Sequence, residues 1–229
     1  MRAESVRAVL KVLSDAHVRF LVAGGLAVNA HGVVRLTHDI DLVIQLIPEH
    51  IRCAFDALLR LGYRPSVPVT AEQFADDATR KGWIEEKGMQ VLNFWSDQHK
   101  ETPLDIFVTE PFPFDEEYER ATVRSLVGME DVRFVSLQTL LQMKEAANRK
   151  KDQGDIEDLR LMEGQKMSES DNAIDWSVTT WEGSRREQMR RAAEIPFDRI
   201  LDCLEEMADI SEALIKQSTS NKIHPRHLL

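Results

Sequence analysis

The sequence predicts an α/β (α+β) fold, in which a mixed sheet flanked by helices is followed by a C-terminal helical module. Short apolar runs, such as residues 20–23 and 42–46, have the length and composition of buried strands, and the segments between them have the apolar spacing of amphipathic helices. Residues 164–180 are polar and turn-rich. We therefore expect a first domain over residues 1–163, a linker over 164–180 and a helical module over 181–229.

The first half of the chain is expected to supply most of the sheet. In order, it contains a helix at 4–15, a strand at 18–23, a short helical segment at 26–31, a strand at 42–46, helices at 48–61 and 70–80, and strands at 89–95 and 103–108. Pro48 in the first turn and Gly62 just past the end delimit the helix between them. The Thr70 hydroxyl is expected to cap the helix that runs to about Arg80. The core-facing residues expected on helices 4–15 and 48–61 are Val6, Val9, Leu10, Leu13, Ile51, Phe55, Leu58 and Leu59.

The second half begins with shorter elements. It is expected to contain a loop at 112–114 that covers the sheet edge, a hairpin of strands 123–126 and 132–135 around Gly128, and a helix at 137–149 capped by Ser136. After the linker we expect a helix at 181–194 and a second helix opened by Pro196. One broad apolar side of that last helix carries Ile200, Leu201, Leu204, Met207, Ala208, Ile210 and Leu214.

The two C-terminal helices cannot bury their apolar faces alone. They need a partner surface, either on the first domain or on another chain. The sequence therefore predicts a protein partner or self-association through residues 181–217 as one of the two solutions.

Length and composition describe an ordinary globular protein. The 229 residues are 43% hydrophobic and 30% charged, and no apolar run approaches the ~18 residues that a membrane span needs. The N-terminus lacks the pattern of a signal peptide, and Cys53 and Cys203 are expected as buried thiols, so we expect a cytoplasmic protein without membrane contact. A net charge of -10 argues against binding along an extended nucleic acid, although a nucleotide or a tRNA end needs only a few basic residues.

An Asp-x-Asp pair at the start of an apolar run carries the strongest chemical signal. Side chains alternate faces along a strand, so Asp39 and Asp41 are expected on one side and Ile40 on the other. Two neighbouring carboxylates repel each other unless a cation lies between them, and Mg²⁺ prefers oxygen ligands. Fourteen residues before Asp39, Gly24-Gly25 ends the preceding strand, and peptide N–H groups at such a turn suit phosphate oxygens.

These residues resemble the signature of the nucleotidyltransferase superfamily related to DNA polymerase β. That signature is a Gly-Gly or Gly-Ser pair, a spacer, an Asp-x-Asp, and a third carboxylate on a later strand. The corresponding positions here are Gly24, Gly25, Asp39, Asp41 and Asp105. Asp105 is chosen because it lies within an apolar strand, where an uncompensated carboxylate would be costly.

A finer resemblance concerns the residues between the glycines and the acidic pair. The form Arg35-x-Thr37-x-Asp39-x-Asp41 resembles the branch that contains the AbiEii-type toxins, and the similarity covers about residues 15–162. Helix 137–149 and the Lys-Asp-x-x-Asp-Ile run after it resemble a further motif of that family.

The resemblance implies a set of site residues. Asp39, Asp41 and Asp105 would be catalytic and would hold two Mg²⁺ ions, and the residues implied for nucleotide binding are Gly24, Gly25, Arg35, Thr37 and Lys144. Spacing alone leaves alternatives open. Asp41 is also placed to pair with Arg35, and the run around Lys144 and Asp152 has the composition of a solvated charged turn.

The implied function is transfer of a nucleoside monophosphate from a nucleoside triphosphate to an acceptor hydroxyl. The acceptor would be an RNA or tRNA 3′ end or a protein, in a component of a toxin–antitoxin system. Two alternatives stay open. One is an adenylyltransferase that acts on a small molecule of the aminoglycoside type, because the positive charge of such a molecule suits an acidic protein. The other is a catalytically inactive antitoxin or scaffold.

Overall fold

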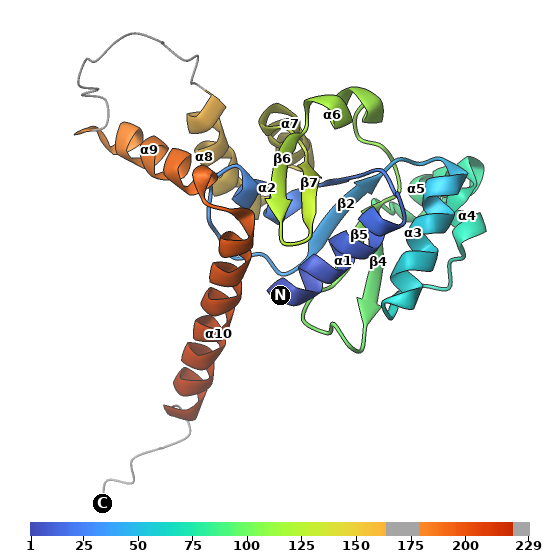
Figure 1. The fold of residues 1–229 in the computed structure, drawn as a ribbon, viewed down its shortest axis with the longest axis horizontal. Helices are drawn as coiled ribbons and strands as arrows, with labels where there is room; N and C mark the ends of the chain where they lie inside the picture. Colours follow the sequence, from blue (N-terminus) through green and yellow to red (C-terminus); the bar gives the residue numbers. More distant parts are fainter. Residues whose placement is uncertain (164–178, 222–229) are drawn as a thin grey trace, which may run out of the picture.

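One mixed sheet runs through the computed structural model, which describes residues 1–163 and 179–221 (Figure 1). Its strands are β1 (Phe20–Val22), β2 (Ile40–Ile44), β3 (Tyr63–Pro65), β4 (Val91–Ser96), β5 (Leu104–Phe107), β6 (Thr122–Leu126) and β7 (Met129–Phe134). Within the described ranges their order is β3-β4-β5-β2-β1-β7-β6. The β2–β5 and β1–β7 pairs are parallel and the others antiparallel, so the predicted mixed sheet is confirmed.

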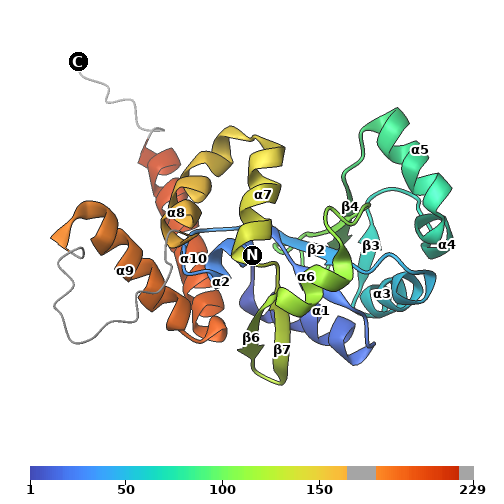
Figure 2. The same ribbon diagram turned by 90° about the horizontal axis from the view of Figure 1, so that it is seen from above.

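Helices flank this sheet, with α1 and α7 on opposite sides of it (Figure 2). The helices are α1 (Ala3–Asp15), α2 (Gly24–Ala30), α3 (Pro48–Arg60), α4 (Ala71–Ala75), α5 (Asp77–Lys87), α6 (Phe114–Arg120), α7 (Leu137–Ala147), α8 (Gln153–Glu163), α9 (Trp181–Glu194) and α10 (Phe197–Asn221), with a 3₁₀ turn at Lys150–Asp152. The α/β fold class with additional C-terminal helices follows directly from this arrangement.

The core lies between the sheet and the amphipathic helices. All four residues expected to be buried on α1 are buried, and so are Ile51, Phe55 and Leu58 on α3. The prediction for Leu59 is wrong, because its side chain is 48% exposed. The apolar stripe of α3 is therefore narrower than the sequence pattern indicated.

The helix expected over residues 70–80 is two helices. Thr70 caps α4 as predicted, through its hydroxyl and the Gln73 backbone N–H. At Asp76 the backbone is extended, with φ −78° and ψ 115°, and the Asp76 carboxylate accepts the Thr79 N–H to begin α5. A carboxylate in mid-helix competes for backbone donors in this way, and here it caps a new helix.

Two further elements differ from the sequence prediction. The loop expected at 112–114 ends at Phe114, which is buried and begins α6. The edge strand β3 has only three residues and so leaves no periodic pattern to detect. The expected burial of both thiols is also wrong, because Cys203 is exposed and Cys53 half-buried.

The first part of α10 packs against other elements of the same chain. This helix packs on α1 and β6, and its Phe197 ring lies 4.7 Å from that of Phe134. Of its expected apolar side, Ile200, Leu201 and Leu204 are buried, whereas Ile210, Leu214 and the neighbouring Ile215 are exposed. Of the two kinds of partner surface considered above, the same chain thus provides the one for the near end of α10, through α1 and β6.

The linker prediction falls largely on residues 164–178, which lie outside the described residues, so the domain boundary stays a prediction. Among the helices that are described, none combines the length and the hydropathy required to cross a bilayer.

Candidate active site

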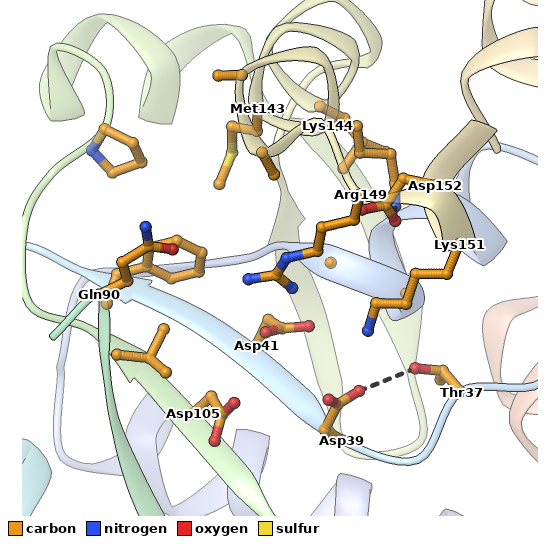
Figure 3. A pocket seen from close by; sticks show the side chains of 18 of the residues that line it. Thr37, Asp39, Asp41, Gln90, Asp105, Met143, Lys144, Arg149, Lys151 and Asp152 are labelled. Carbon is orange, nitrogen blue, oxygen red and sulfur yellow. Dashed lines mark hydrogen bonds and ion pairs between the residues drawn. The ribbon is translucent and has the colours of Figure 1, made fainter. Parts of the chain in front are cut away.

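Parallel pairing of β2 with β5 brings the three predicted carboxylates together. Asp41 is the direct register partner of Asp105, and Asp39 lies one residue before β2. Carboxylate oxygens of the three residues lie within 4.8 Å of one another. All three side chains point into the same cavity (Figure 3). The predicted convergence of these residues from neighbouring strands is therefore observed.

Burial and the crowding of the carboxylates raise the pKa of Asp41 and of Asp105. Burial, reinforced by the negative charges of Asp39 and Asp105, raises the pKa of Asp41 to about 7. Burial also raises the pKa of Asp105, against the opposing effect of the Asn93 amide, which donates to Asp105 Oδ1 at 2.6 Å. A positive charge held between these carboxylates would favour their ionised forms.

A hard divalent cation fits this donor set. All the ligand atoms are carboxylate oxygens, which is the chemistry that Mg²⁺ selects over softer metals. Their mutual separation, within 4.8 Å, allows oxygens from different residues to reach a common ion with small side-chain adjustments. Asp39, Asp41 and Asp105 are thus the residues that could hold Mg²⁺.

The glycine pair permits a close approach between the start of α2 and the acidic strand. Gly24 has φ +57°, and a Cβ built on it would lie 1.7 Å from Asp41 Oδ2. A Cβ on Gly25 would lie 2.2 Å from Thr37 Oγ1. No larger residue fits at either position without displacing the site. Thr37 in turn donates to Asp39 Oδ1 at 3.2 Å, which orients that carboxylate.

Asn29 fixes the loop between α2 and β2. Its amide nitrogen donates to the carbonyls of Gly25 and Arg35, and its Oδ1 accepts the Arg35 N–H. His31 is buried, with Nε2 2.9 Å from the Val135 carbonyl. Asn29 and His31 thus both make hydrogen bonds that hold the backbone around the site.

Lys144 lies in a buried charge cluster at the cavity wall. Its Nζ donates to Asp152 Oδ1 and to Asp155 Oδ2, both at 2.8 Å, and all three side chains are buried. The alternative of a solvated charged turn is therefore wrong. Arg35 makes a bidentate pair with Asp155 at 2.7 and 2.8 Å, so the alternative pairing of Arg35 with Asp41 is not the one formed. Whether Lys144 contacts a nucleotide stays a prediction.

Two basic residues that the sequence analysis did not single out point toward the carboxylates. Arg149 and Lys151 are exposed, and their side chains extend from the segment between α7 and α8 into the cavity (Figure 3). The charge of Lys151 acts on Asp41 and that of Arg149 on Asp105, in each case lowering the carboxylate pKa against the larger effect of burial. The signal in the sequence was the basic run Arg149-Lys150-Lys151, close to the predicted Lys144.

The cavity around these residues has a volume of about 770 Å³. Its lining includes every predicted site residue, namely Gly24, Gly25, Arg35, Thr37, Asp39, Asp41, Asp105 and Lys144. The size matches that of small-molecule and cofactor sites.

Comparison with known proteins adds little to this geometry. No family model matches the chain, and the search of curated proteins gives no match. Two structures of the antibiotic-resistance factor ANT(2'')-Ia are similar to it. The solution structure has 12% identity and a TM-score of 0.41 and covers 95% of this chain and 97% of that one. The crystal structure with adenylyl-2''-tobramycin has 14% identity and a TM-score of 0.45, covering 82% and 97%. Likenesses this distant carry no functional argument, and the AbiEii-like branch stays a prediction.

Proposed function

We propose that this protein is a Mg²⁺-dependent nucleotidyltransferase, which transfers a nucleoside monophosphate from a nucleoside triphosphate to an acceptor hydroxyl. One observation carries the proposal. Asp39, Asp41 and Asp105 gather within 4.8 Å directly beside a glycine turn that tolerates no side chain. Carboxylates that hold divalent cations next to a phosphate seat are what phosphoryl-group transfer requires.

Each part of the site has a place in this chemistry. Asp39 and Asp41 would hold both metal ions, and Asp105 the one nearer the acceptor. Bound Mg²⁺ would supply charge neutralisation at the phosphates and would lower the pKa of the acceptor hydroxyl. The turn at Gly24-Gly25 presents peptide N–H groups, with no Cβ to keep phosphate oxygens away.

Positive side chains complete the phosphate side of the cavity. Arg149 and Lys151 extend toward the triad and are placed to neutralise the β- and γ-phosphates (Figure 3). Arg35 and Thr37 shape the loop around the nucleotide. Lys144 acts in this proposal through its ion pairs, because its ammonium is already held by two carboxylates.

The proposed acceptor is an RNA or tRNA 3′ end or a protein hydroxyl, within a toxin–antitoxin system, as the Arg35-x-Thr37-x-Asp39 resemblance implies. A cytoplasmic location and a protein partner for residues 181–217 belong to the same proposal. Exposed apolar side chains of that range, among them Trp181 at the start of α9 and Ile210 and Leu214 on α10, would contact such a partner.

The decisive test is a transfer assay with the full chain. The protein is incubated with each of the four α-labelled nucleoside triphosphates, Mg²⁺, and total tRNA, protein or kanamycin as acceptors. We expect label transfer by the wild type and none by Asp39→Ala or Asp41→Ala, with folding checked by circular dichroism.

Asp97→Ala, at an exposed loop position outside the cavity, is the matched control and should keep wild-type activity. Near-normal turnover in either triad variant would refute the proposed metal site, and labelling of kanamycin alone would favour the small-molecule alternative. A lack of metal binding in the wild type would favour the inactive scaffold.

A further inference from the structure

The cavity has two chemically unlike halves on either side of the carboxylate triad. One half holds the glycine turn and Lys151, and Arg149 extends from the same side to the middle of the cavity. The other half is lined by Val91, Phe107 and Met143, which are partly buried apolar side chains. Figure 3 shows Lys151 on the α8 side and Met143 and Gln90 on the other side, with the Arg149 guanidinium extending between them above Asp41.

Strand geometry places the apolar half directly beside Asp105. Phe107 follows Asp105 by two residues on β5, so the two side chains share a face of the sheet. Val91 on β4 is the register partner of Phe107. Met143 approaches from α7 on the other side of the cavity (Figure 3). An apolar slot therefore lies between the sheet and α7, next to the third carboxylate.

The in-line geometry of the proposed reaction indicates which molecule occupies this slot, and this step rests on the proposed function. In phosphoryl-group transfer the attacking oxygen and the leaving oxygen lie roughly in line, on opposite sides of the phosphorus. If the cationic half takes the leaving pyrophosphate, the acceptor hydroxyl must approach from the other half. The apolar slot beside Asp105 then receives the group that carries that hydroxyl.

The charges of the cavity restrict what this group is. Among the described residues that line the cavity, Asp152 is the one carboxylate besides the triad, and it is paired with Lys144. A polycation would find no carboxylate of its own in this lining. Neutral polar side chains, Gln90, Thr109 and Gln142, stand around the apolar ones. Such a lining suits a ring with apolar faces and a hydrogen-bonding edge.

We propose that the acceptor enters the Val91–Phe107–Met143 slot as an uncharged ring of nucleoside type and that the site discriminates against polycationic acceptors. The negative net charge of the whole chain is compatible with a cationic drug, but the local lining is not. The slot thus determines the acceptor class, while the triad and the cationic half determine the reaction.

Binding measurements on the full chain test this proposal without knowledge of the natural acceptor. The protein is first loaded with Mg²⁺ and a non-hydrolysable triphosphate analogue, and then titrated by calorimetry with adenosine, with uridine and, separately, with kanamycin. We expect at least one nucleoside to bind at least about tenfold more tightly than kanamycin. Phe107→Ala should weaken that binding by about 5-fold to 100-fold, the usual effect of removing a stacking partner, and Met143→Ala should act in the same direction from the opposite wall. Both variants should keep the affinity of the wild type for the analogue.

Val127→Ala, on the exposed hairpin turn, is the apolar control and should leave all affinities unchanged. Kanamycin binding equal to or tighter than that of both nucleosides would overturn the proposal, and so would nucleoside binding that is absent or insensitive to Phe107→Ala and Met143→Ala. Failure of the proposed function has a different signature, because the analogue would then not bind, or would bind equally to Asp39→Ala. In that case the nucleoside titrations are run without the analogue and still report on the slot.

Discussion

Replacing Asp41 by asparagine is expected to stabilise the metal-free chain at pH 8 while abolishing its Mg²⁺ binding. Burial and the neighbouring carboxylates raise the pKa of Asp41 from 3.8 to about 7. The folded chain therefore binds this proton more tightly than the unfolded chain does. The resulting stability is present in full below about pH 4 and is lost as the pH rises through about 7.

The magnitude follows from the size of that shift. A shift of about three pKa units corresponds to about 4 kcal/mol, which we reduce to about 2 kcal/mol because the Asp41 side chain is partly exposed. An asparagine of the same shape carries no charge at any pH, so the variant escapes this cost. For a chain of this size we expect its melting temperature at pH 8 to exceed that of the wild type by about 4–8 °C.

Differential scanning fluorimetry in EDTA between pH 4 and pH 8.5 measures this effect. The difference between the Asp41→Asn variant and the wild type should be small at pH 4 and should grow toward pH 8. Mg²⁺ should raise the melting temperature of the wild type at pH 8 and leave that of the variant unchanged, because only the wild type binds the ion. Asp97→Asn, at an exposed position, serves as the control. Equal melting temperatures for the wild type and Asp41→Asn at pH 8 in EDTA would refute the described crowding of the carboxylates.

Three further substitutions probe other parts of the structure. Lys144→Met should leave two buried carboxylates without their shared cation and lower the free energy of unfolding by about 3–5 kcal/mol; urea denaturation measures this, and an unchanged midpoint would contradict the cluster. Gly24→Ala should weaken Mg²⁺ binding at least about tenfold in calorimetry, because the new Cβ would lie 1.7 Å from Asp41 Oδ2; unaltered affinity would speak against the close approach. Phe197→Ala removes a buried ring packed against Phe134 and should cost about 3–5 kcal/mol; a loss below about 1 kcal/mol would show that α10 is not anchored there.

The acidic triad was predictable from local sequence for a physical reason. Alternation along a strand places Asp39 and Asp41 on one face, and the apolar neighbours of Asp105 made it the costly carboxylate that needs compensation. What no local pattern supplied was the β2–β5 pairing, which places Asp41 opposite Asp105. The family resemblance, rather than spacing, supplied that link.

The charge cluster shows where local pattern fails. Asp155 and Arg35 are 120 residues apart, yet they form a bidentate pair. In the sequence, the Lys-Asp-x-x-Asp run has the composition of a solvated turn, and burial of such a run depends on a partner from a distant segment. Asp76 illustrates the converse, because a strong local cap divided a helix that apolar spacing alone extended through it.

The same cluster joins three parts of the chain around the site. Asp155 on α8 accepts hydrogen bonds from Arg35, in the loop that leads to Asp39, and from Lys144 on α7. Because a carboxylate buried between two cations is costly to leave unpaired, this arrangement holds the loop against both helices. Arg35 therefore acts on the metal site by fixing the backbone that carries Thr37 and Asp39.

Helix α9 contacts the other end of that loop, at Gly32. A Cβ on Gly32, just after α2, would lie 2.1 Å from the Met189 carbonyl of α9, so the helix backbone contacts the loop directly. Arg185 on α9 also makes a bidentate pair with Asp158 on α8. The backbone of α9 thus packs directly against the start of the segment that leads to Asp39. Helix α9 is also linked to that segment through α8, whose Asp158 pairs with Arg185 and whose Asp155 pairs with Arg35.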